Sequence, residues 1–425
     1  MMPQLDYSIQ FNALTELLKL TQPLWQVVAF DCHDLPWQED FPRLAERVWQ
    51  IDDANLDAID SDQTLLVGHL LSALQADLTG LGQSSQLPLL HWLTSGSDKA
   101  IFTKSNLNLS IATSELSHFS AHIKGRKWQQ IVAFTEQVFS QPTIYPVLEW
   151  CAGKGHLGRL IAKTQQCQVT SLEWQQALCD DGQAFAQQWQ LEQQFICADA
   201  FAAIDVTDSA SPIKTKQHAV ALHACGDLHV RLLDLAAKAN TQAISISPCC
   251  YHLIHAKYYQ PLSRLAQQAQ LSLSRHDLQL PLQQSVIASK KQNALRIQEV
   301  AWRLGFDSLQ RDIRKIDQYL PVPTLKQSQL SGSFSDFCHW AAKQKGLVIA
   351  NHIDIESYLV IGKQRQRLTQ RIDLVRHVFR SVLEQWLVLD RVCFLTEQNY
   401  HVTLSKFCPS SITPRNILID AKKTI

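Results

Sequence analysis

The feature that most constrains the fold is a regular alternation of short apolar runs with longer amphipathic stretches, which begins near Thr143. Five apolar runs end in polar residues, at Ile144–Trp150, Gln168–Trp174, Gln194–Ala198, His218–His223 and Ala243–Ser247. The intervening stretches have the length of helices, at Leu157–Thr164, Gln175–Trp189 and Val230–Ala239. This alternation predicts an α/β fold with a mainly parallel sheet covered on both faces. Because such sheets bind ligands at the carboxyl ends of their strands, the residues after each run are the candidate site.

A glycine-rich turn follows the first run, in the sequence VLEWCAGKGHLGRL. Its glycines, Gly153, Gly155 and Gly158, let the backbone approach a ligand, and the start of the next helix offers free N–H groups. The spacing alone is weak evidence, since it fits a dinucleotide, other nucleotide-like ligands or a simple tight turn. The candidate cofactor contacts in this segment are Glu149, Cys151, Ala152, Gly153, Gly155, His156 and Leu157.

Acidic residues at the ends of the next two runs favour one of these ligands. Glu173, which precedes Trp174, lies about 20 residues beyond the first glycine, where a carboxylate can accept hydrogen bonds from both ribose hydroxyls. Asp199, which precedes Ala200, suits the exocyclic amine of an adenine. Carboxylates after three successive strands suit S-adenosyl-L-methionine, which carries an ammonium, a ribose and an adenine but no phosphate. Glu149 would repel the pyrophosphate of a nicotinamide or flavin dinucleotide. Any one carboxylate taken singly also fits a solvent-facing strand end.

Four segments together resemble a known family: EWCAGKGHLGR at 149–159, LHACGDLH at 222–229, SPCCYH at 247–252 and LVLDRVCFLTEQNYHVTLSKFCPSSITPRNILI at 387–419. From about Lys124 onward the chain is similar to class I S-adenosylmethionine-dependent methyltransferases of the AGKGHL/CCYH family. Relatives there include the tRNA 2′-O-methyltransferase with a CHHC finger and the ribosomal RNA adenine dimethylase domain-containing proteins. The resemblance implies a Rossmann-like seven-stranded sheet and this cofactor, without implying one substrate. Cys151 stands where the general methyltransferase loop has glycine, and no segment of the sequence resembles a CHHC finger.

The acceptor side is expected after the fourth and fifth runs. Methyl transfer from a sulfonium requires the enzyme to position the nucleophile and, where the nucleophile bears a proton, to remove it. The candidate catalytic residues are His223, Asp227, Cys249, Cys250 and Tyr251. His223 or Asp227 is a candidate general base, Tyr251 can shape the pocket floor, and His223 also belongs to the candidate cofactor contacts. The plainer alternative is that His223 and the cysteines are packed strand-end residues.

Two further interpretations concern the adjacent cysteines, Cys249 and Cys250. A thiolate that adds to C6 of a pyrimidine would make this a 5-methylpyrimidine enzyme. A zinc site from these cysteines with His252 and His255 would need ligands packed more tightly than the usual spacing allows. We therefore expect no metal.

The sequence predicts four segments, with boundaries at 1–120, 121–271, 272–398 and 399–425. These are a mainly helical N-terminal domain, the cofactor half of the methyltransferase core, a helical insertion and the closing antiparallel strands of the core. A helix that opens at Lys124 either lays Lys127 near the cofactor or simply packs beside the first strand. The insertion contains helices at 301–323 and from about Arg365 to Gln398, the second with an apolar stripe expected in the core. We expect this insertion to form a lid over the strand ends.

The net charge of zero conceals an asymmetry. Residues 1–140 hold 16 acidic and 8 basic side chains, whereas residues 282–425 hold 21 basic and 12 acidic ones. The basic run contains Lys363, Arg365, Arg367, Arg371, Arg376 and Arg380. A run of this kind is commonly a solvated helix face. In a lid above a methylating site it indicates a phosphate-bearing acceptor, and RNA is the expected partner.

The remaining expectations concern environment and activity. The 11 cysteines, an amino terminus without a signal-peptide pattern and the lack of an apolar run of about 18 residues predict a cytoplasmic protein with reduced thiols and no membrane span. The leading hypothesis is an S-adenosylmethionine-dependent methyltransferase that acts on tRNA or rRNA. The alternatives are a methyltransferase of a protein or small molecule, and an inactive cofactor-binding scaffold. The sequence leaves the oligomeric state open.

Overall fold

The computed structural model describes residues 7–95, 117–140, 142–283, 290–324 and 330–424, and the chain divides into two compact units. The first, here called the sheet unit, contains the described parts of Met1–Thr15, Asp98–Gln279 and Glu384–Ile425. The second, here called the helical unit, contains the described parts of Glu16–Ser97 and Leu280–Leu383. The N-terminal helices and the insertion helices therefore share one compact body.

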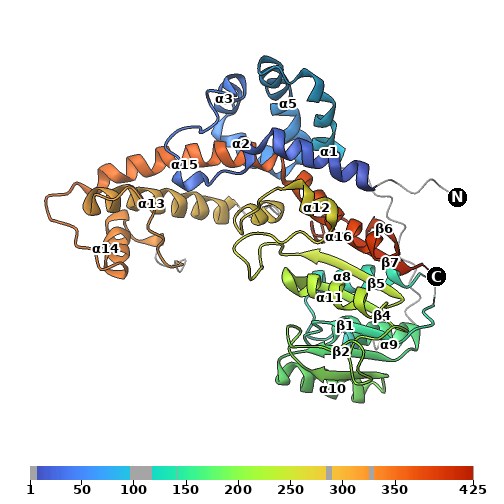
Figure 1. Ribbon diagram of the computed structural model, residues 1–425. Coiled ribbons are helices and arrows are strands. Elements are labelled where there is room, and N and C mark those ends of the chain that lie inside the picture. The colour runs from blue at the N-terminus through green and yellow to red at the C-terminus, as the bar shows by residue number, and fades with distance from the viewer. Residues whose placement is uncertain (1–6, 96–116, 141, 284–289, 325–329, 425) are drawn as a thin grey trace. The chain divides into compact units, whose positions relative to one another are not determined.

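The sheet unit is built on seven strands in the order β3-β2-β1-β4-β5-β7-β6 (Figure 1). The strands are β1 Val147–Trp150, β2 Val169–Glu173, β3 Gln193–Cys197, β4 His218–Cys225, β5 Ala243–Cys249, β6 Tyr400–Lys406 and β7 Ile417–Lys423. Strands β1 to β5 pair in parallel, and β7 pairs antiparallel with both β5 and β6. The Rossmann-like seven-stranded α/β sheet of a class I methyltransferase, with its closing antiparallel pair, is thus confirmed. The strand order reverses direction between β1 and β4, and sheets of this kind bind ligands at the carboxyl edge where the order reverses.

Alternate residues of the strands enter two apolar cores, one on each face of the sheet. Helices α8 Gly125–Val138 and α9 His156–Gln165 contribute Phe134 and Leu160 to the core that contains Val147. Helices α11 Asp227–Lys238 and α16 Arg380–Glu397 pack on the core that contains the next residue, Leu148. Helix α10 Gln176–Gln188 contacts β3, and the short helix α12 Arg264–Ala269 follows β5. Both faces are covered, as a parallel sheet requires.

The helical unit contains short and long helices from the N-terminal segment and from the insertion before the last two strands (Figure 1). Their bounds are α1 Tyr7–Leu20, which begins in the sheet unit, α2 Gln22–Trp25, η1 Ala29–Asp31, α3 Pro42–Trp49, η2 Asp53–Asn55, α4 Leu56–Ser61, α5 Gln63–Gly80, η3 Ser84–His91, α6 Trp92–Ser95, η4 Asp277–Leu282, α13 Lys290–Arg314, α14 Phe334–Gln344 and α15 Ile355–His377. Helices α13 and α15 approach closely, because a Cβ on Gly362 would lie 2.2 Å from the Ala301 carbonyl oxygen. In the described part of the chain, we find no helix with the length and apolar character of a membrane span.

Most of the basic run lies inside the helical unit and not on its surface. Arg365, Arg371, Arg376 and Arg380 are each at most 6% exposed. Their partners come partly from the acidic N-terminal segment: Asp53 for Arg371, Asp60 for Arg380 and the Trp25 carbonyl for Arg376. Arg365 Nη1 donates to Asp307 Oδ2 at 2.8 Å. The charge asymmetry of the sequence is therefore partly cancelled by ion pairs within one unit, and these four arginines form no exposed phosphate-binding surface.

The single helix predicted from about Arg365 to Gln398 is wrong, because the helix breaks after His377. Helix α15 ends there, and α16 begins at Arg380. The N–H groups of Val378 and Phe379 bond three residues back, to the carbonyls of Val375 and Arg376, and the Val378 carbonyl accepts from Gln63 Nε2 at 2.9 Å. This side-chain bond replaces the next helical bond and allows the change of direction. The predicted apolar stripe is nevertheless buried on both sides of the break.

Candidate active site

The glycine-rich turn between β1 and α9 has a backbone that few residue types adopt. Gly153 and Gly155 have φ of 57° and 64°, and Cys151 has φ of 56°. Gly155 also has no room for a side chain, since a Cβ there would lie 2.4 Å from the Phe195 ring. At Gly153, by contrast, an added Cβ would meet nothing within 4 Å. The turn therefore has an open side at Gly153, where the backbone can approach a ligand. Ala152 fastens the turn to β2 through its N–H, which donates to the Leu172 carbonyl at 2.9 Å.

Glu149 lies beneath this turn, in a buried polar network. Its Oε2 accepts a hydrogen bond from Ser171 Oγ at 2.7 Å, and the backbone N–H groups of Leu157 and Gly158 also bond the carboxylate. Gln193 Nε2 donates to Ser171 Oγ and to the Gly155 carbonyl. Burial raises the pKa of Glu149 to about 7, against the opposing effect of these hydrogen bonds. The structure thus places Glu149 where it holds the start of α9 against β1 and β2.

The acidic residues after β2 and β3 have different environments. The buried Glu173 carboxylate accepts from the N–H groups of Gly153 at 2.9 Å and Gln175 at 3.1 Å, so it braces the glycine turn. Asp199 is exposed, and its Oδ1 accepts from the Phe201 N–H at 2.9 Å. The side chain of Trp174 is 69% exposed, whereas Ala200 is buried. The negative charges of Glu173 and Asp199 both help to raise the pKa of the Cys151 thiol, after the larger effect of burial. Both carboxylates are therefore close to the turn.

His156 and Leu157 begin α9 and face different surroundings. Leu157 is buried in the core beside Ile131 and Leu160. His156 Nδ1 pairs with Arg159 Nη2, and the Arg159 guanidinium lies 3.9 Å from the centre of the Phe185 ring. Burial, with the neighbouring positive charges, lowers the pKa of His156 to about 3, so this imidazole is neutral at physiological pH.

Lys127 and His223 connect the cofactor side with the acceptor side. Lys127 is exposed at the start of α8, and its charge acts on Glu149, His156 and His223. His223 lies at the irregularity of β4, with φ of 69°, and its Nε2 is 2.6 Å from Gln130 Oε1. An amide oxygen requires a proton on Nε2, which leaves the lone pair on Nδ1. Burial lowers the pKa of His223, in the same direction as the charge of Lys127.

Asp227 fastens the loop that follows β5. Its Oδ2 accepts from the backbone N–H of His255 at 2.8 Å and lies 3.0 Å from His255 Nδ1. The Asp227 N–H in turn donates to the Leu253 carbonyl at 3.0 Å. The His255 ring packs edge-on against Phe201, at 4.8 Å between ring centres. Asp227 thus joins the start of α11 to two loops and has a supporting position rather than a free carboxylate.

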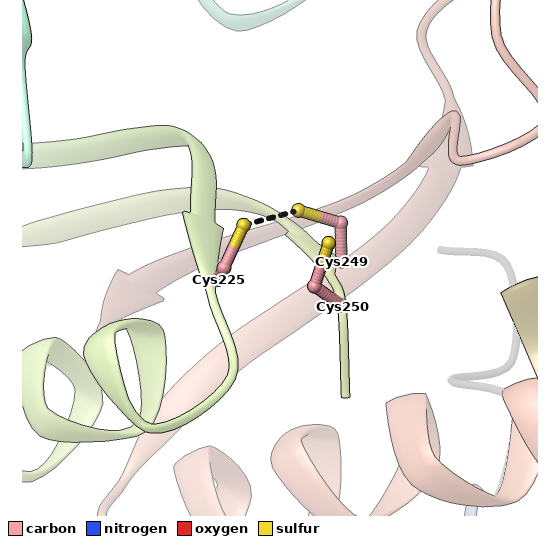
Figure 2. Close-up of side chains that lie close together, drawn as sticks. All are labelled: Cys225, Cys249 and Cys250. Atoms are coloured by element: carbon pink, nitrogen blue, oxygen red, sulfur yellow. Dashed lines mark hydrogen bonds between the residues drawn. The ribbon is translucent and has the colours of Figure 1, made fainter. Parts of the chain in front are cut away.

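Cys249 and Cys250 lie beside a third cysteine, Cys225, which was not among the candidate catalytic residues or zinc ligands. Figure 2 shows Cys225, from the end of β4, facing both of them. The Sγ atoms of Cys225 and Cys249 are 3.5 Å apart, and all three Sγ atoms lie within 4.8 Å of one another. Contacts with Cys225 and Cys249 lower the pKa of Cys250. Contacts with Cys225 and Cys250 raise the pKa of Cys249.

Tyr251 is fully buried beside a carboxyl group that no sequence motif marked. Its ring lies 5.2 Å from the Arg391 guanidinium, and the charge of Glu384 acts on its hydroxyl, which has no hydrogen-bond partner among the described residues. Burial raises the pKa of Glu384 to about 7, against the charges of Arg415 and Lys406. Glu384 and Arg415 thus lie beside candidate site residues, and the sequence did not predict either of them as part of the site. Glu384 lies more than 130 residues along the chain from Tyr251, within a helical apolar pattern, and only the fold brings them together.

A buried polar cluster explains why the LDRVC segment belongs with the other motifs. Asp390 accepts hydrogen bonds from Tyr259 Oη and from the N–H groups of Leu262, at 2.9 Å, and Ser263, at 2.7 Å. Arg391 donates to Tyr259 Oη at 2.8 Å and to His229 Nε2 at 3.1 Å. These contacts tie α16 to the chain that follows β5 and to the start of α11. They fix the backbone that carries the acceptor-side residues.

The segment from α8 to the loop after β5 also matches a known family. Residues 125–257 match a family model described as a methyltransferase domain. The matched segment contains the glycine turn, both acidic strand ends and all three clustered cysteines.

Solved structures to which the chain is similar include three with low sequence identity and low TM-scores. A structure of WbdD is 15% identical, with 28% of this chain and 27% of that chain covered and a TM-score of 0.21. The chain thus spans about a quarter of WbdD. An rRNA methylase from Streptococcus thermophilus is 12% identical, covering 30% and 72%, with a TM-score of 0.21. The plantazolicin methyltransferase BpumL, solved in complex with SAH, is 12% identical, covering 73% and 90%, with a TM-score of 0.26. The strand order and the family match together support a class I methyltransferase domain in the sheet unit.

Proposed function

We propose that the protein is an S-adenosyl-L-methionine-dependent methyltransferase that acts on RNA. One observation supports S-adenosylmethionine as the cofactor. The open glycine turn lies beside two carboxylates and has no free cation of its own. Lys154, the one basic residue within the turn, pairs with Asp181 at 2.7 Å. A ligand with hydroxyls and amines would find hydrogen-bond acceptors here in the carboxylates of Glu173 and Asp199.

The residues present fit such a ligand. Each oxygen of the Glu173 carboxylate accepts one backbone N–H, which leaves further lone pairs for ribose hydroxyls. Asp199 is exposed after β3, at the same carboxyl edge. Near Gly153 the backbone has no neighbouring atom where a Cβ would lie. S-adenosylmethionine would supply an activated methyl group, and the chain would hold it with Glu173, Asp199 and the turn.

The acceptor side would then position the nucleophile and take its proton. His223 is the better placed candidate base, because the Gln130 contact at Nε2 leaves Nδ1 with a lone pair. Asp227 is bonded to His255 and acts as a positioning residue. Tyr251, buried against Arg391, supports the loop after β5 from within the core.

RNA as the acceptor rests on exposed basic residues of the sheet unit, since four arginines of the basic run are buried. Lys124, Arg126 and Lys127 are exposed at the start of α8. The charge of Lys127 reaches His223, and the charge of Arg415 reaches both His223 and Cys250. Positive charge around the acceptor side favours a substrate with a phosphate backbone.

The function is tested by transfer of labelled methyl groups from S-adenosylmethionine to RNA from cells that lack the gene. We expect label in tRNA or rRNA, and one modified nucleoside that mass spectrometry finds in wild-type RNA alone. If the label enters a protein or small-molecule fraction instead, that fraction and not RNA contains the substrate. No transfer to any fraction by protein that binds the cofactor would favour the scaffold alternative.

A matched pair of variants tests the RNA surface. Lys124→Gln/Arg126→Gln removes two exposed charges near the site, and Lys214→Gln/Lys216→Gln removes two at the amino end of β4. The first variant should weaken RNA binding and lower the slope of log K against log salt by about 1.4 to 1.8, whereas the second should change neither. Equal effects of the two variants would contradict an RNA surface at the start of α8.

A further inference from the structure

Neither methyl transfer nor core packing accounts for the grouping of three thiols at the ends of β4 and β5. Cys225 ends β4, Cys249 ends β5, and the two residues are paired neighbours in the parallel sheet. Cys250 follows directly, and its Sγ faces the same point (Figure 2). Cys249 is buried, and the other two are partly exposed. An ion from solvent can therefore reach a site whose ligands are otherwise enclosed.

The backbone brings adjacent cysteines to one point, although neighbours in a strand normally face opposite sides. Cys250 leaves the strand with φ of 48°, and its carbonyl accepts from the Leu253 N–H at 3.0 Å in a tight turn. On the other strand, the Gly226 N–H donates to the Cys249 carbonyl at 3.2 Å. A Cβ on Gly226 would lie 1.9 Å from the Leu253 carbonyl oxygen. Glycine is therefore required for the close approach that gathers the thiols.

The sulfur positions match those of thiolate ligands around one metal ion. A tetrahedral site with Zn–S bonds of about 2.3 Å places its sulfurs about 3.8 Å apart. The Cys225 and Cys249 sulfurs are 3.5 Å apart, and no pair of the three exceeds 4.8 Å. A disulfide would instead need about 2.05 Å, and all three cysteines are free. The sulfur–sulfur distances are thus close to those of a metal site and much longer than that of a disulfide bond.

We propose that Cys225, Cys249 and Cys250 bind a Zn²⁺ ion, whose fourth position is open to water or another ligand. Three protein ligands with one open position are typical of catalytic rather than structural zinc sites. This inference concerns metal binding alone and does not depend on the proposed methyl transfer. It also revises our expectation of no metal, which considered His252 and His255 and missed Cys225. His255 is bonded to Asp227, whereas the sheet supplies Cys225 from a neighbouring strand.

Electrostatics support the assignment. Zinc would displace the protons of these thiols, since cysteine binds metal as the thiolate. The positive charge of Arg415 acts on both Cys225 and Cys250, and it would offset part of the negative charge of a zinc site with three thiolates.

The test is zinc analysis of the full-length protein purified in reducing buffer. We expect one zinc per chain, with affinity reduced at least a hundredfold in Cys225→Ser, Cys249→Ser and Cys250→Ser. Cys167→Ser is the matched control, because that cysteine is also partly exposed in the sheet unit but lies outside the cluster. It should keep full zinc content.

A readout on the wild-type protein guards against variants that fail to fold. Cobalt titration should give the charge-transfer absorption of thiolate-bound Co²⁺, and bound zinc should protect Cys225, Cys249 and Cys250 from alkylation. The proposal is overturned if the reduced wild-type protein takes up neither zinc nor cobalt. It is equally overturned if alkylation of the three thiols is unaffected by zinc.

Discussion

Replacement of Gly158 by alanine tests how the glycine turn is held in place. Gly158 lies in the first turn of α9, directly above the buried polar network. A Cβ there would lie 2.4 Å from Glu149 Oε2, 2.6 Å from Gln193 Nε2 and 3.0 Å from Ser171 Oγ. These three side chains are buried and bonded to one another, so none can turn toward solvent. We therefore predict that Gly158→Ala destabilises the sheet unit and displaces the turn.

The size of the effect follows from opposing contributions. Alanine is favoured over glycine in a helix interior by roughly 1 kcal/mol. Overpacking costs about 1–3 kcal/mol, and pulling Glu149 away from its hydrogen bonds costs about 1.5–3 kcal/mol. The unfavourable contributions exceed the helix gain. We expect the free energy of unfolding to fall by about 1.5–5 kcal/mol.

The assay combines thermal unfolding with hydrogen exchange of peptides from β1 and α9. The control is Gly68→Ala, in the middle of α5, where an added Cβ meets nothing within 4 Å. That substitution should leave stability unchanged or raise it by up to about 1 kcal/mol. A Gly158→Ala protein as stable as wild type, with unchanged exchange in α9, would refute the close contact with Glu149.

Three further predictions concern buried groups. Burial raises the pKa of Glu149 from 4.5 to about 7, so the folded state holds a proton that the unfolded chain releases. The contribution of Glu149 to the free energy of unfolding is therefore fully present below pH 4.5 and is lost as the pH rises through about 7. The loss amounts to about 3 kcal/mol. Glu149→Gln should therefore lose that pH dependence in urea unfolding; an unchanged profile argues against a raised pKa. Asp390→Asn should lower stability by about 2–4 kcal/mol in the same assay, since it leaves buried Arg391 without its neighbouring charge, and a loss under 0.5 kcal/mol would contradict this. Gly362→Ala should lower the melting temperature of the helical unit by several degrees, because α13 and α15 must separate; calorimetry that shows no shift would contradict the contact.

The sheet was predictable because its signal is local. Each strand and its following helix are adjacent in the sequence, and the turn after β1 has glycines where the backbone needs positive φ. The antiparallel pair at the end of the sheet was predictable from the resemblance over residues 387–419. The roles of single carboxylates were less accessible, since Glu149 and Glu173 both bond to the backbone near the turn.

Other features depend on pairing between distant segments, which spacing does not encode. Cys225 joins Cys249 and Cys250 only through the β4–β5 register. The basic run resembles a solvated face until the fold supplies Asp53 and Asp60 from more than 300 residues away. Composition reports such charges without their partners.

Binding of S-adenosylhomocysteine tests the central claim most directly. Isothermal titration calorimetry on the folded wild-type chain should show one site per chain. Asp199→Asn should weaken binding about tenfold or more, because it removes a charged hydrogen-bond acceptor at the end of β3. Glu192→Gln, an exposed carboxylate at the opposite end of β3, should leave the affinity unchanged. No heat of binding to the folded wild-type protein would contradict the cofactor assignment.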